Sequence, residues 1–169
     1  MAERLSLRDY QRALATRLRE AESRRTTFKL GLQIDADEWL VDLADAGEVI
    51  PVPAITPVPL TRPWFKGVTN IRGNLYSVID FAAFLGGPPS VVGEQTRLLL
   101  IGEHYRTASA LLVSRSLGLR NPALLHARRP NGPRSPWIRA EYGDAEGKTW
   151  KELDVPKLVQ HPDFLGVAA

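Results

Sequence analysis

The chain has 169 residues, which suits one domain or two small packed lobes, and 44% of them are hydrophobic, enough to fill a sizeable core. The formal net charge of +3 is mild, and the absence of cysteine excludes disulfides and thiolate-bound zinc or iron–sulfur clusters. The 13 glycines and 13 prolines, which follow no repeat, favour many short strands joined by turns. The charged N-terminus lacks the apolar stretch of a signal peptide, and no apolar run approaches the roughly 18 residues that span a bilayer. We therefore expect a cytoplasmic protein without membrane insertion.

An amphipathic helix is predicted over residues 7–25, within an N-terminal segment 1–25. Tyr10, Leu14 and Leu18 recur at helical spacing, and six arginines occupy the other positions of this stretch. The apolar stripe is narrow and contains no Trp or Phe. This favours a helix packed against the body of the domain over a helix that binds a membrane surface or an acidic partner, which is the alternative.

An alternation of apolar and polar residues with period two predicts a hairpin after residue 26. Residues 28–34 and 39–43 each alternate, and the acidic run 35–38 lies between them. Carboxylates could bind a divalent cation, but three of them without a further ligand motif are more typical of a solvated hairpin tip.

A short apolar segment at residues 48–53 and an extended, proline-rich connector at 54–62 follow. Residues 67–71 and 75–81 then predict a second hairpin around a tight Arg-Gly-Asn turn. Residues 82–85 predict one helical turn that ends at a Gly-Gly pair.

The second half of the chain predicts more strands and one short helix. Residues 115–126 fit a strand end followed by a short helix, and residues 127–136 fit a loop. The other predicted elements are strands at 97–101 and 107–113, a hairpin of 137–142 with 148–153, and a helix at 155–159 with Pro156 in its first turn.

No catalytic motif stands out in the chain. The three histidines lack a second ligand at metal spacing, no serine lies in a Gly-x-Ser-x-Gly elbow, and no glycine cluster forms a phosphate cradle. Carboxylate pairs that converge only in the fold stay open as a possibility. Residues 120–139 carry five arginines and no acid, so a small basic β-barrel that binds nucleic acid is the alternative function. The acid-rich residues 141–154 would offset the positive charge of these arginines. This favours the interpretation that residues 120–139 form a solvated insertion.

Residues 63–87 carry a resemblance to a known family. Residues 64–73 read Trp-Phe-Lys-Gly-Val-Thr-Asn-Ile-Arg-Gly, residues 78–81 read Val-Ile-Asp-Phe, and Leu85-Gly86 closes the segment. This resembles the signature of CheW-like chemotaxis coupling domains. The likeness covers residues 26–114 and extends more weakly to the end. The N-terminal helix and residues 117–121 are similar to the variant found in type IV pilus (twitching motility) chemosensory systems.

The resemblance implies a mainly β fold of two intertwined five-stranded SH3-like β-barrels over residues 26–169, with a hydrophobic groove at their junction. It implies no enzyme activity and no cofactor. The domain would act as an adaptor between the regulatory domain of a CheA-type histidine kinase and the tip of a methyl-accepting chemoreceptor. It would assemble into arrays or rings and control twitching motility. No nucleic-acid partner is expected.

The same resemblance assigns candidate partner-binding residues one by one. Arg72 matches the arginine of Asn-x-Arg-Gly, and its guanidinium is expected to fork to backbone carbonyls or to Asp80, either to hold the loop or to contact a partner. Glu48 matches an acidic residue near the receptor groove. The remaining candidates are Asp80, the neighbours Asn70 and Gly73, and the apolar Val49, Val68 and Ile71; these three apolar residues also suit ordinary core packing. Tyr76 and Ser77 stand directly before Val-Ile-Asp, where the family usually has an apolar residue followed by proline.

Overall fold

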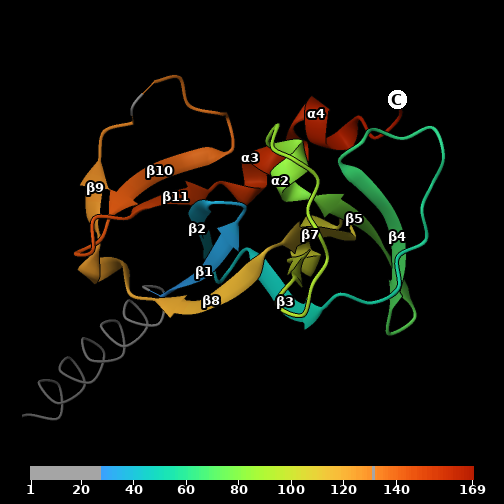
Figure 1. The fold of residues 1–169 in the computed structure, drawn as a ribbon, viewed down its shortest axis with the longest axis horizontal. Helices are drawn as coiled ribbons and strands as arrows, with labels where there is room; N and C mark the ends of the chain where they lie inside the picture. The colour runs from blue at the N-terminus through green and yellow to red at the C-terminus, as the bar shows by residue number, and fades with distance from the viewer. Residues whose placement is uncertain (1–27, 131) are drawn as a thin grey trace, which may run out of the picture.

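The computed structural model describes residues 28–130 and 132–169, which form two mixed β-sheets with a few short helices (Figure 1). The mainly β prediction is therefore confirmed. The helix predicted over residues 7–25 lies outside the described residues.

The first sheet has the strand order β8-β1-β2-β11-β10-β9. Neighbouring strands are antiparallel, except that β11 runs parallel to β2. Its strands are β1 (Lys29–Ile34), β2 (Asp37–Asp42), β8 (Arg115–Arg120), β9 (His126–Arg128), β10 (Ile138–Gly143) and β11 (Thr149–Leu153).

The second sheet has the order β3-β6-β7-β5-β4, and only β5 and β7 are parallel. The chain enters it after β2 and returns to the first sheet at β8. Its strands are β3 (Ala46–Pro51), β4 (Phe65–Ile71), β5 (Asn74–Asp80), β6 (Arg97–Ile101) and β7 (Ser109–Val113).

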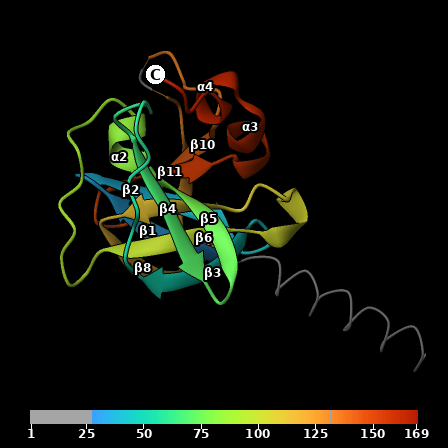
Figure 2. The ribbon, with the colours of Figure 1, turned by 90° about the vertical axis from the view of Figure 1, so that its right-hand side faces the viewer.

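Among the described residues, three short α-helices gather on one side of the two sheets (Figures 1 and 2). They are α2 (Phe81–Phe84), α3 (Val155–Gln160) and α4 (Pro162–Leu165). Phe84 of α2 lies 5.8 Å from Phe164 of α4 and 5.0 Å from Trp137, measured between ring centroids. These aromatic contacts join the C-terminal helices to the middle of the chain.

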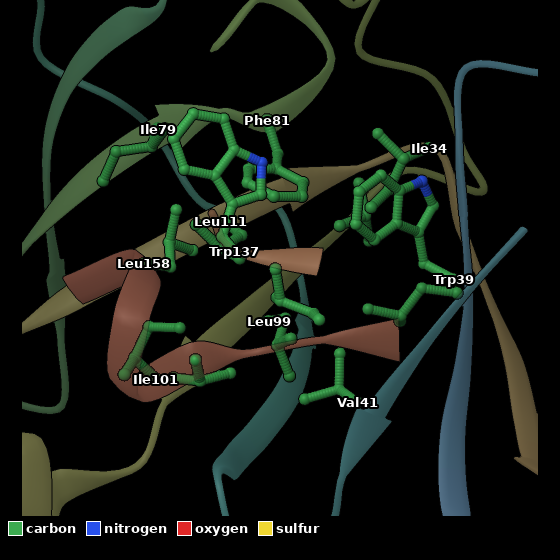
Figure 3. Close-up of a cluster of buried hydrophobic side chains, with 14 of the residues drawn as sticks. Ile34, Trp39, Val41, Ile79, Phe81, Leu99, Ile101, Leu111, Trp137 and Leu158 are labelled. Carbon is green, nitrogen blue, oxygen red and sulfur yellow. The ribbon is translucent and has the colours of Figure 1, made fainter. Parts of the chain in front are cut away.

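One hydrophobic core is shared by both sheets. Alternate residues of β1, such as Leu32, meet Leu99 of β6 and Leu111 of β7, and all three are fully buried. Trp39 packs edge-to-face on Phe81, with ring centroids 5.5 Å apart (Figure 3). Because side chains from both sheets fill the same space, neither sheet has a separate interior on this side.

The second sheet also buries its other face, which explains the uninterrupted apolar runs of β6 and β7. Leu98, Leu100 and Leu112 point into a second core with Val78. Residues of the connector after β3, including Ile55, pack against this second core. The connector thus covers a face that would otherwise be open to water.

Close contact between the connector and β4 closes the second sheet. Thr56 and Val68 exchange two backbone hydrogen bonds, at 2.8 and 2.9 Å, although β3 and β4 are opposite edges of the sheet. A Cβ atom at Gly67 would lie 2.0 Å from the Thr56 carbonyl oxygen, and Gly67 has φ +129°. Only glycine fits at this closure point.

A buried carboxylate lies inside the first sheet with a full set of partners. Glu152, 3% exposed, accepts hydrogen bonds from Lys29 at 3.0 Å, Arg139 at 3.3 Å and the Tyr142 hydroxyl at 2.8 Å. Burial and the bond to Glu152 raise the pKa of Tyr142 to about 12, so its hydroxyl keeps its proton and still donates in moderately alkaline solution. The ion pairs compensate for the burial of this charge.

The structure differs from the sequence-based expectation in the second half of the chain. The first sheet has six strands because β9 forms where residues 127–136 were expected to be a loop. Its Ala127 pairs with Tyr142 of β10. The stretch 115–126 agrees with the expectation of a strand followed by a short helix: it forms the largely exposed strand β8 and then a 3-10 helix at Pro122–Leu124. Helix α4 was not predicted, because its four residues are too few to show periodicity.

Replacing Gly67 with alanine should lower the free energy of unfolding by about 3 kcal/mol, because the new methyl group meets the Thr56 carbonyl and the backbone conformation disfavours a side chain. Urea unfolding followed by circular dichroism measures the change.

Gly147→Ala is the matched control, since Gly147 also has positive φ (+82°) but no atom lies within 4 Å of its Cβ position. This variant should lose only about 1 kcal/mol. Equal losses in the two variants would show that the close approach to Thr56 has no special importance.

Candidate partner-binding groove

A two-residue turn places Arg72 at the tip of the β4–β5 hairpin. Ile71 pairs with Asn74, so only Arg72 and Gly73 form the turn, with φ of 53° and 88°. Two successive positive φ angles are typical of a type I′ turn, whose twist matches that of the strands. The Asn70 side-chain oxygen accepts a hydrogen bond of 2.9 Å from the Gly73 amide. Asn70 and Gly73 therefore build the turn that presents Arg72.

The Arg72 guanidinium forms a fork with the carboxylate of Glu48. Its two terminal nitrogens donate to the two Glu48 oxygens at 2.7 and 2.8 Å. Glu48 belongs to β3, so this ion pair links the β3 edge of the second sheet to the hairpin tip beside the opposite edge, β4. The hydrogen bond from Arg72 holds the pKa of the Glu48 carboxyl below its usual value. Both side chains stay open to solvent, 73% and 45% exposed, so salt screens the pair.

A groove of about 310 Å³ lies beside this ion pair. Ile71, Leu100 and Ile101, which are nearly fully buried, provide apolar surface at its floor, and Tyr76 is half-buried. The rim carries both signs of charge. The complete lining is Gly47, Glu48, Ile71, Arg72, Asn74, Tyr76, Leu100, Ile101 and Glu103.

Comparison with known proteins identifies the family. The family model described as CheW-like domain matches residues 29–163. The chain belongs to the CheW-like domain family.

Individual proteins agree with this assignment. This CheW-like chain is 28% identical to protein PilI of Pseudomonas aeruginosa over 149 residues, which cover 82% of this chain and 79% of PilI. It is 30% identical to the chemotaxis protein CheW of Thermotoga maritima over 90 residues, 53% of this chain and 58% of that protein. The crystal structure of the scaffolding protein TtCheW from Thermoanaerobacter tengcongensis matches with a TM-score of 0.62 at 15% identity. That match covers 76% of this chain and 88% of TtCheW, and it shows the shared fold.

The structure brings together only part of the predicted site of this CheW-like protein. Glu48, Ile71 and Arg72 share the groove. Val49 instead packs against the core between the two sheets. Val68 precedes Ile71 by three residues in β4, so the two side chains lie on opposite faces of the strand. Neither valine lines the groove.

The Arg72 guanidinium bonds to Glu48 and, among the described residues, neither to a backbone carbonyl nor to Asp80, so both expected partners of Arg72 are wrong. Asp80 is fully buried at the start of α2, where it accepts hydrogen bonds from the Ala83 amide and from the amide and hydroxyl of Ser90, the latter two at 2.7 Å. The Lys66 Nζ lies 3.3 Å from Asp80 Oδ2, the oxygen that also accepts the Ser90 amide. Asp80 ends β5, six residues beyond the turn, which is about 20 Å along a strand. Its role is to cap α2 and hold the following loop.

Sequence reasoning missed the groove residues that come from β5 and β6. Tyr76 could have been found from the alternation in β5, since it shares a face with Asn74. Leu100 and Ile101 read as ordinary strand residues, and only the pairing of β6 with β3 places them beside Glu48.

Two other stretches were considered as sites, the acidic run 35–38 and the arginine-rich stretch 120–139. Most of their charged side chains contact other groups of the protein. Lys151 and Lys148 bind Asp37 at 2.6 Å and Glu38 at 3.0 Å, so the acidic hairpin is neutralised by lysines. In the arginine-rich stretch, Arg128 donates to the Thr149 hydroxyl. Arg120, Arg134 and Arg139 also contact protein groups. Among the helices that the structure describes, none is long and apolar enough to cross a membrane.

Replacing Arg72 with alanine should raise the pKa of the Glu48 carboxyl toward the ordinary value for glutamate, because the hydrogen bond from Arg72 is the main cause of its depression. A carboxyl with a depressed pKa stabilises the folded state above its unfolded-state pKa. The stability advantage of wild type over Arg72→Ala should therefore disappear as pH falls through the folded-state pKa of Glu48. NMR titration of the side-chain carboxyl measures the pKa.

Asp144 provides the internal control. Its pKa is lowered mainly by a hydrogen bond from the Trp150 indole, in the other sheet, and should stay low in Arg72→Ala. A Glu48 titration that does not change would disprove the importance of the fork in solution.

Proposed function

We propose that this protein is a non-catalytic adaptor that couples a CheA-type histidine kinase to a chemoreceptor. It would work in the cytoplasm, in a chemosensory array next to membrane-bound receptors, and control twitching through type IV pili. Membership of the CheW-like family supports the adaptor role. Similarity to PilI over most of both chains supports the pilus system.

The groove beside the Glu48–Arg72 pair is the observation that carries this proposal. An apolar floor with a charged rim suits an amphipathic receptor helix, whose apolar stripe would lie on Ile71 and Leu100. The rim charges would then set the orientation and the rate of association more than the affinity. We expect an interface of modest area and transient affinity, as is common for signalling contacts.

The two parts of the chain would have separate tasks. Residues 26–169 would form the coupling domain with its two β subdomains, and residues 1–25 would add an amphipathic helix. The regulatory domain of the kinase would bind the same coupling domain at a surface other than the groove, so that one adaptor contacts both partners.

The alternative of nucleic-acid binding has one supporting feature. Arg128, Arg129, Arg134 and Lys151 line a cavity of about 610 Å³ on the first sheet. Because several of these side chains are bound to protein groups, we rank this function second.

The purified protein should bind the regulatory domain of the cognate kinase and the receptor tip, and Arg72→Ala should weaken the receptor contact about tenfold or more, as expected of a central arginine in an interface. Isothermal titration calorimetry or a pull-down with each partner measures this. Circular dichroism must show that the variant folds.

Arg129→Ala is the matched control, because Arg129 is exposed and lies outside the groove. It should bind both partners normally and serves to test the alternative function. Failure of folded wild-type protein to bind either partner would refute the adaptor proposal. A mobility shift of nucleic acid that weakens steeply with salt and is lost in Arg129→Ala would favour the alternative.

A further inference from the structure

A second, more apolar pocket of about 370 Å³ lies at one end of the first sheet. It is formed where β1 begins, where β8 ends and where β10 turns into β11, on the side of the molecule opposite to the β4–β5 hairpin (Figure 1). Phe28, Leu119 and Leu124 line it and are 42%, 60% and 71% exposed. Exposed large apolar side chains that share one pocket are typical of a surface that another segment covers.

This pocket has one arginine in its floor and two acidic residues at its rim. Arg120 lies over the Trp150 ring at 5.1 Å, and the Trp150 indole donates to Asp144 at 2.9 Å. These contacts fix the floor. Asp144 and Glu146 form an acidic rim, and the Glu146 side chain is 77% exposed. An occupant with an apolar stripe and flanking positive charges would complement this pocket.

The chain itself contains such a segment directly before the pocket. Residues 7–25 carry six arginines against three acidic residues, and Leu14, Leu18 and Ala21 recur at helical spacing. Only Thr26 and Thr27 separate this segment from Phe28, which is itself a lining residue.

We propose that the N-terminal segment folds back as a helix and covers this pocket in the same molecule. The two threonines can span about 7 Å, enough to reverse the chain direction. With a rise of 1.5 Å per residue, Leu18 then lies about 10 Å from the C-terminal end of the helix, over the leucines of the pocket. The arginines of the helix pair with Asp144 and Glu146 at the rim.

The absence of cysteine in the natural sequence allows a direct test by disulfide trapping in the full chain. Leu124→Cys is combined in turn with Leu14→Cys, Leu18→Cys or Ala21→Cys, and mild oxidation follows. At least one pair should lose both free thiols and migrate as a monomer on a non-reducing gel, because a disulfide forms only when Cα atoms approach within about 7 Å.

Two control pairs test the face and the place of contact. Thr16→Cys with Leu124→Cys probes the opposite side of the predicted helix. Leu18→Cys with Leu75→Cys uses another exposed leucine, 61% against 71% for Leu124, at the distant β4–β5 hairpin. Both pairs should keep their thiols. Glu146→Arg should slow trapping of the reactive pair, since it reverses a charge on the rim.

Three outcomes would overturn the proposal. A cross-linked dimer would show that a second copy occupies the pocket. Equal trapping of the control pairs would show a segment without a fixed site. No trapping at any of the three stripe positions would show that the pocket is covered by something else or stays open. Each result leaves the kinase and receptor interaction to be judged by its own binding assay.

Discussion

The closure of the second sheet at Gly67 is the constraint on which the candidate site depends. Because glycine lets β4 approach the Thr56 carbonyl, the connector can wrap around and bond to the edge opposite the one it leaves. The same closure of the sheet brings Glu48, at the β3 edge, within hydrogen-bonding distance of Arg72, beside the β4 edge. The ion pair between them is exposed and adds little to stability on its own. Its position is therefore a consequence of the backbone closure and not its cause.

The shared core ties this site to the rest of the molecule. Val49, next to Glu48 in β3, packs into the core between the sheets, so the strand that carries the acidic rim residue is anchored to both halves. Asp80 anchors the other end of the hairpin through α2 and Ser90. A groove held at both ends by buried contacts is largely pre-formed, which reduces the entropy lost when a partner binds.

The sequence predicted the elements whose signal is local. Alternation located most strands, and the Asn-x-Arg-Gly pattern located the turn that presents Arg72. It could not predict the partner of Arg72, because Glu48 is 24 residues away in sequence and meets it only through closure of the sheet. Leu100 was missed for the same reason, since its place in the groove depends on the pairing of β6 with β3. Strand β9 has three exposed residues and no apolar alternation, so only its pairing with β10 reveals it.

The outer edges of the first sheet have a consequence for how copies of this protein can associate. An unpaired edge strand is a template for adding further strands and so for aggregation. Here one edge, β9, is only three residues long, and the other, β8, has arginine at both ends and an irregular register with β1. Both features hinder continuous backbone pairing between molecules. Copies of the protein held close together are therefore hindered from joining through the two edges of the first sheet.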